Sequence, residues 1–145
     1  MKEVGAWSVI FFVIMSVSAY HFYVVAKKRK VRALLNARVQ LAHQEFGRIH
    51  FGDSRLRAQL ASDVREILSQ HVPVLLDGLH PHDKFQEQLL IDTFDSMASI
   101  EFISDLEEKY GISFRNEPSL GRDLTFRELI DLIEKRVTEL QPGDK

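Results

Sequence analysis

The chain has 145 residues and a formal net charge of −2, which allows one modest domain and an accessory segment. It contains no cysteine, which excludes disulfides and thiolate metal sites. Residues 1–52 carry eight Lys/Arg against two Asp/Glu, whereas residues 53–145 carry eleven against nineteen, and this acidic second part argues against a nucleic-acid partner.

The chain opens with an apolar run. Residues 4–26 contain no Asp, Glu, Lys, Arg or Pro, and as a helix they would span about 34 Å, enough to cross a hydrocarbon core of about 30 Å. Trp7 lies near one end and Tyr20 and Tyr23 near the other, as is typical of aromatic residues at the two membrane interfaces. The sequence therefore predicts a single transmembrane helix.

A basic cluster follows this run directly. It consists of Lys27, Lys28, Arg29, Lys30 and Arg32. Positive charges behind a long apolar run are the reverse of the order in a cleaved signal peptide. By the positive-inside rule the cluster stays in the cytoplasm and the N-terminus lies outside. We therefore expect residues 1–32 to form a single-pass anchor with a stop-transfer cluster.

Residues 33–52 place apolar side chains at roughly helical spacing and are predicted to form a juxtamembrane helical connector. Such a helix could lie on anionic lipid, pack on a partner helix or act as a semi-rigid spacer. Gly52, followed by Asp53 and Ser54, is typical of a boundary with a new helix start. A separate cytoplasmic domain is therefore expected over residues 53–145.

Three apolar stripes at helical spacing occur in this domain, and no segment alternates with a period of two, so an all-α fold is predicted. The first covers residues 54–70, with Arg57, Asp63, Arg65 and Glu66 expected on its solvent face. The loop 71–94 is rich in Leu and Ile and is expected to be pinned to the core.

The second stripe covers residues 95–112, where Gly111 closes the helix. Its apolar face is predicted to consist of Met97, Ile100, Ile103, Leu106 and Tyr110, with Phe102 beside it. After an irregular piece over 113–124, Thr125 and Glu128 form a capping box for the last helix.

The stretch from Asp95 to Val137 resembles the second half of an acyl or peptidyl carrier domain. Such domains have Asp-Ser-Leu at the head of their second helix, and this chain reads Asp95-Ser96-Met97. With residues 54–70 as the first helix, the resemblance covers about 54–138, with some likeness to the small D-alanyl carriers. The family's usual Gly before Asp-Ser is replaced here, and the loop before it is longer. The resemblance implies a four-helix carrier bundle.

The resemblance also implies a cofactor and its attachment site. The hydroxyl of Ser96 would carry 4′-phosphopantetheine, and Asp95 would be recognised by the modifying phosphopantetheinyl transferase. The arm would supply the thiol that the polypeptide lacks and hold cargo as a thioester. The implied partner-binding surface consists of Met97, Glu101, Asp105 and Glu108, where acidic side chains meet basic patches on partner enzymes.

The function implied is a membrane-anchored acyl or aminoacyl carrier, which is not itself an enzyme and has no catalytic residue. The expected partners are the phosphopantetheinyl transferase, a cargo-loading ligase, a membrane-associated acyltransferase and the lipid bilayer, and the bacterial character of the resemblance implies the inner membrane. Two alternatives are open. The chain could be an unmodified carrier-like adaptor in a membrane complex, or a lipid-surface binder acting through residues 27–51.

One short motif invites a metal interpretation. His80 and His82, followed by Asp83, could ligate zinc, but Pro81 constrains their geometry and no further ligand cluster is evident. We therefore expect no metal site. Asp95 and Ser96 also lack the G-x-S-x-G context of a hydrolase nucleophile.

Overall fold

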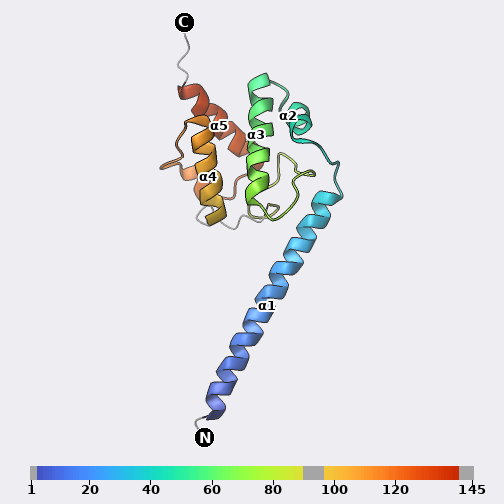
Figure 1. Cartoon of the computed structure of the whole chain (residues 1–145), viewed down its shortest axis with the longest axis vertical. Coiled ribbons are helices and arrows are strands. Elements are labelled where there is room, and N and C mark those ends of the chain that lie inside the picture. The colour runs from blue at the N-terminus through green and yellow to red at the C-terminus, as the bar shows by residue number, and fades with distance from the viewer. Residues whose placement is uncertain (1–2, 90–96, 141–145) are drawn as a thin grey trace.

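The computed structural model describes residues 3–89 and 97–140 (Figure 1). Over these residues the protein contains no β-strand, which confirms the all-α prediction. The elements are α1 (Glu3–Asn36), α2 (His43–Phe51), α3 (Arg55–His71), α4 (Met97–Tyr110), the 3-10 helix η1 (Pro118–Gly121) and α5 (Phe126–Leu140). That these helices form the four-helix bundle of a carrier domain stays a prediction.

Helix α1 has 34 residues and is therefore about 50 Å long. Figure 1 shows it projecting away from the domain formed by the other helices. Its apolar side chains, such as Phe12 and Phe22, are largely exposed, so no other part of the described chain covers them. By length and composition Ser8–Asn36 is a candidate membrane-spanning helix near the N-terminus.

The segment predicted as one helical connector is divided in two. Helix α1 continues through the basic cluster to Asn36, the chain then turns, and α2 begins only at His43. The turn caps the C-terminus of α1, because Gln40 Nε2 donates a hydrogen bond to Leu35 O at 3.0 Å. Residues 33–52 therefore do not form one continuous helix.

Both halves of this segment contribute to the core. Leu35 is 1% exposed, and Phe46 and Phe51 of α2 are equally buried. The Phe46 ring meets the Phe126 ring of α5 edge-on at 5.5 Å between centroids. Gly47 lets α2 approach α3 closely, since a Cβ at this position would lie 2.2 Å from Ala58 O.

Helix α3 is central and packs against α2, α4 and α5. It starts as predicted, because Ser54 Oγ accepts a hydrogen bond from Arg57 N at 3.0 Å. Its Leu60, Val64 and Leu68 are buried, as the stripe indicated.

Arg65 of α3 contradicts the predicted solvent face, because it is completely buried. Its Nε and Nη2 donate to Leu76 O at 3.1 and 2.6 Å, and Nη2 also donates to Leu41 O at 2.7 Å. The guanidinium lies 4.7 Å from the centroid of the Phe46 ring. Burial lowers the pKa of Arg65, although Asp77 opposes this effect. The side chain therefore ties α3 to the two loops that carry these carbonyls, and Leu76 O also accepts a hydrogen bond from Leu79 N at 2.9 Å.

The described part of the long loop after α3, which extends to Leu89, is pinned to the core, as predicted for residues 71–94. Its buried side chains are Val74, Leu76, Leu79, Phe85 and Leu89. Phe85 N donates to Leu124 O and Phe126 N donates to Asp83 O, both at 3.0 Å, so the loop pairs with the start of α5.

The start of α5 confirms the predicted capping box. Thr125 N donates to Glu128 Oε2 at 2.8 Å, and Glu128 N donates to Thr125 Oγ1 at 3.2 Å. The buried stripe of α5 includes Phe126, Leu129 and Ile133.

Helix α4 buries only part of the predicted apolar face. Leu106, with Phe102 beside it, is fully buried, and Ile103 and Tyr110 pack partly buried against the core. Met97 and Ile100, in contrast, are 73% and 51% exposed. The buried side chains face α3, so the face is set by the position of α3 and not by hydrophobicity alone. The helix ends at Tyr110, and Gly111 follows with φ +63°, the left-handed conformation typical of a helix C-terminus.

Candidate functional site

The two residues predicted to carry and to recognise the cofactor, Ser96 and Asp95, lie outside the residues that the structure describes. The next residue, Met97, is the first of α4 in the described chain. Its side chain is exposed, and so is that of Ile100 one turn later. The first turn of α4 is therefore an open surface directly after Ser96 in the sequence.

Two of the three predicted acidic contact residues face α3. The carboxylate of Asp105 lies 2.7 Å from His71 Nε2, and that of Glu101 lies 3.9 Å from His71 Nδ1. Glu101 and Glu108 remain exposed, whereas Asp105 is half-buried. The exposed face of α4 therefore combines Met97 and Ile100 with acidic side chains, and Asp105 also serves the α3–α4 contact.

A groove of about 520 Å³ lies beside α4. It is lined by Ile100, Ile103, Ser104 and Glu107 of α4 and by Ser113, Phe114, Arg115 and Leu120 of the following segment. Glu107 joins the two walls, because its Oε1 accepts a hydrogen bond from Phe114 N at 2.6 Å. Isoleucine, leucine and phenylalanine side chains with a polar rim can enclose an apolar chain. The sequence showed these residues only as parts of a helix and a loop, so the groove was not predicted.

Glu117 holds the second wall of this groove against α5. Its Oε1 accepts hydrogen bonds from Ser119 N at 3.2 Å and Ser119 Oγ at 2.7 Å, and its Oε2 accepts one from Arg136 Nη2 at 2.8 Å. The hydrogen bonds from Ser119, together with the one from Arg136, lower the pKa of Glu117 to about 2. Glu117 thus caps η1 and anchors it to α5 in its ionised form.

Glu117→Gln should remove an acid-sensitive part of the stability. Because the folded pKa of Glu117 lies below its ordinary value of 4.5, the ionised carboxylate stabilises the fold fully above about pH 4.5, and this contribution is lost as the pH falls towards 2. At neutral pH the variant should be less stable by about 1 kcal/mol, the usual value of a capping interaction. The measurement is thermal unfolding of the detergent-solubilised full chain between pH 2 and 7, followed by circular dichroism.

The matched control is Glu108→Gln, an exposed carboxylate on α4. It should follow the wild-type pH dependence. Parallel curves for wild type and Glu117→Gln would contradict the role assigned to Glu117.

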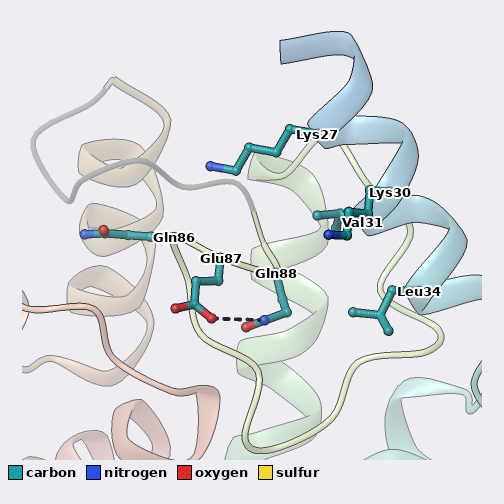
Figure 2. Close-up of a pocket in the computed structure, with 7 residues that line it drawn as sticks. All are labelled: Lys27, Lys30, Val31, Leu34, Gln86, Glu87 and Gln88. Atoms are coloured by element: carbon teal, nitrogen blue, oxygen red, sulfur yellow. Dashed lines mark hydrogen bonds between the residues drawn. The ribbon is translucent and has the colours of Figure 1, made fainter. Parts of the chain in front are cut away.

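A second cavity, of about 660 Å³, lies between α1 and the loop after α3 (Figure 2). Lys27, Lys30, Val31 and Leu34 line it from α1, and Gln86, Glu87 and Gln88 line it from the loop. Figure 2 shows the lysines on one wall and Glu87 on the other, where Gln88 Nε2 donates to Glu87 Oε2 at 3.3 Å.

The end of α1 is docked onto the domain below this cavity. Arg38 Nη1 donates to Asp83 Oδ2 at 2.5 Å and to Gly78 O at 3.3 Å. Gly78 lies directly against α1, because a Cβ there would be 1.9 Å from Leu35 O. Val31 is also buried, so α1 is held by packing as well as by charge.

Three histidines gather near the start of α5. The rings of His50 and His80 lie 5.5 Å apart and those of His80 and His82 5.3 Å apart. Burial lowers the pKa of His50 and of His80. Asp83 is engaged by Arg38 and by His80 N at 2.8 Å. Over residues 3–89 and 97–140 there is no group of three or more His, Cys, Asp or Glu side chains placed to hold a metal ion.

The described residues thus form an all-helical domain that is joined to a candidate membrane helix. No protein-family model matches the chain, and no curated protein matches it.

Proposed function

We propose that this chain is a membrane-anchored carrier protein that holds an acyl cargo as a thioester on 4′-phosphopantetheine attached to Ser96. Other enzymes load and unload it: a phosphopantetheinyl transferase attaches the arm, a ligase supplies the cargo, and a membrane-associated acyltransferase removes it. The observation that carries this proposal is the open first turn of α4, which directly follows Ser96 and adjoins an apolar groove.

The residues around the start of α4 fit a phosphopantetheine group. Free backbone N–H groups and the helix dipole at a helix start favour the charge of a phosphodiester. The exposed side chains of Met97 and Ile100 leave the surface open to the arm and to partner enzymes. When bound, the group supplies the thiol that the polypeptide lacks. Ile103 and Phe114 in the groove favour an apolar acyl cargo over a charged aminoacyl one.

The arrangement of the helices suits delivery at a membrane. In Figure 1, α4 starts at the side of the domain towards which α1 runs to its N-terminus. With the basic cluster in the cytoplasm and the N-terminus outside, the first turn of α4 would lie on the side of the domain towards the inner surface of the cell membrane. Confinement at that surface raises the effective concentration at a membrane enzyme.

The test is the intact mass of the full chain purified from its native host, compared with Ser96→Ala. The wild type should be heavier than its sequence by about 340 Da, with further mass from a hydroxylamine-labile cargo, and Ser96→Ala should show neither gain. The matched control is Ser104→Ala, an exposed serine of α4, which should keep the modification. An unmodified wild type, even after treatment with coenzyme A and a broad-specificity phosphopantetheinyl transferase, would overturn the proposal.

The docking of α1 favours the adaptor as a second candidate. Gly78 against Leu35 O, and Arg38 paired with Asp83, hold the domain at a set position relative to α1. A fixed position suits an assembly subunit, whereas a carrier domain that moves between partner enzymes benefits from a flexible connection to its anchor. If the chain is an adaptor, the Ser96→Ala variant should co-purify with the same membrane proteins as the wild type. If it is a carrier, Ser96→Ala should abolish cargo transfer.

A further inference from the structure

The cavity between α1 and residues 86–88 lies where the membrane surface is expected. Its first lining residue, Lys27, comes directly after the apolar run that ends at Ala26. Leu34, at the other end of the α1 wall, lies about 10 Å further along the helix. Because the headgroup layer extends roughly 5–8 Å beyond the hydrocarbon core, the cavity opens into that layer.

The two walls of this cavity carry opposite charges. Lys27 and Lys30 lie on α1, and Glu87 lies on the loop between the amides of Gln86 and Gln88 (Figure 2). Lys84 Nζ lies 3.5 Å from Glu87 Oε1, at the exposed edge of the loop. A ligand with a negative group towards Lys30 and a hydrogen-bonding cation towards Glu87 would therefore complement the charges of both walls.

We propose that this cavity binds the headgroup of one aminophospholipid of the phosphatidylethanolamine type. Its phosphate pairs with Lys30, and its ammonium group donates hydrogen bonds to Glu87. The acyl chains then extend into the bilayer along the exposed apolar side chains of α1, such as Phe22.

This headgroup fits the walls better than other common headgroups do. An anionic glycerol headgroup would satisfy the lysines but would bring no cation to Glu87. A choline headgroup has a cation without N–H donors, so it cannot form the charge-assisted hydrogen bonds that an ammonium forms with a carboxylate. The inference rests on α1 as a membrane helix and is independent of any modification of Ser96.

The experiment is native mass spectrometry of the detergent-solubilised full chain with phosphatidylethanolamine, phosphatidylcholine and phosphatidylglycerol of identical acyl chains. The wild type should bind phosphatidylethanolamine about tenfold more tightly than phosphatidylcholine, the expected effect of a charge-assisted hydrogen bond. Glu87→Gln should abolish this preference and keep the binding of both lipids. Lys30→Gln should weaken the binding of both.

Lys28→Gln is the matched control, because Lys28 is an exposed lysine on α1 that does not line the cavity. It should bind all three lipids as the wild type does. Equal binding of the ethanolamine and choline lipids by the wild type would overturn the proposal, as would tighter binding of phosphatidylglycerol. A loss in Lys28→Gln equal to that in Lys30→Gln would also overturn it, because general attraction to the basic cluster would then explain the binding. Glu87→Gln should have the same modification state at Ser96 as the wild type, measured by intact mass. The lipid test can therefore fail or succeed independently of the test of the carrier function.

Discussion

Arg65→Met should lower the free energy of unfolding of the domain by about 3 kcal/mol. Methionine fills much of the same volume but donates no hydrogen bond. Leu76 O and Leu41 O, which now accept from the guanidinium at 2.6 to 3.1 Å, would be left without these donors. The stacking on the Phe46 ring would be lost as well. The effect should be large because these carbonyls belong to two irregular segments that converge on α3.

Thermal unfolding of the full chain in detergent measures this effect. Arg65→Lys should recover little, since one ammonium cannot reproduce the planar fork that serves two carbonyls. Arg55→Met on the same helix is the control, because Arg55 is exposed and its replacement should stay within about 0.5 kcal/mol. Equal stabilities of Arg65→Met and Arg55→Met would show that buried apolar volume, and not hydrogen bonding, is what this position requires.

Gly78→Ala should separate α1 from the domain. The added Cβ would lie 1.9 Å from Leu35 O and 2.8 Å from Leu35 C, and both of these atoms belong to the backbone. The loop must shift, which would break the contact of Arg38 with Gly78 O and strain its pair with Asp83. We expect a loss of about 2–3 kcal/mol of stability, as is typical of overpacking at a close contact.

Trypsin cleavage after Arg38 reports on this docking. The rate should rise about tenfold in Gly78→Ala, because the side chain is released and the turn opens. Gly111→Ala is the control: its φ of +63° costs about 1 kcal/mol with a Cβ, but no atom lies within 4 Å, so cleavage at Arg38 should not change. An unchanged cleavage rate in Gly78→Ala would mean that α1 does not depend on this contact.

Several features of the protein could be predicted from the sequence because they depend on neighbouring residues. The apolar run of α1 needs only a stretch of about 20 apolar residues. The cap at Ser54 and the box of Thr125 and Glu128 join residues three positions apart. The Asp95-Ser96 pair, with its implied cofactor, is likewise a pattern in the sequence, and its modification stays a prediction.

Other features were decided by contacts between residues far apart in the chain. The sequence pattern predicts that Arg65 lies on the solvent face of α3, but the loops that carry Leu41 O and Leu76 O cover it. The apolar side chains Met97 and Ile100 are exposed because α3 covers only the Phe102 face of α4.

The sequence by itself thus determined most of the helices, the caps at Ser54 and Thr125 and the apolar run of α1, since helical periodicity and capping are local. The tertiary structure alone decided that α1 docks through Gly78 and Arg38, and that Lys30 and Glu87 line the same cavity. Such pairings depend on how the chain folds back on itself, and no local pattern of residues encodes them.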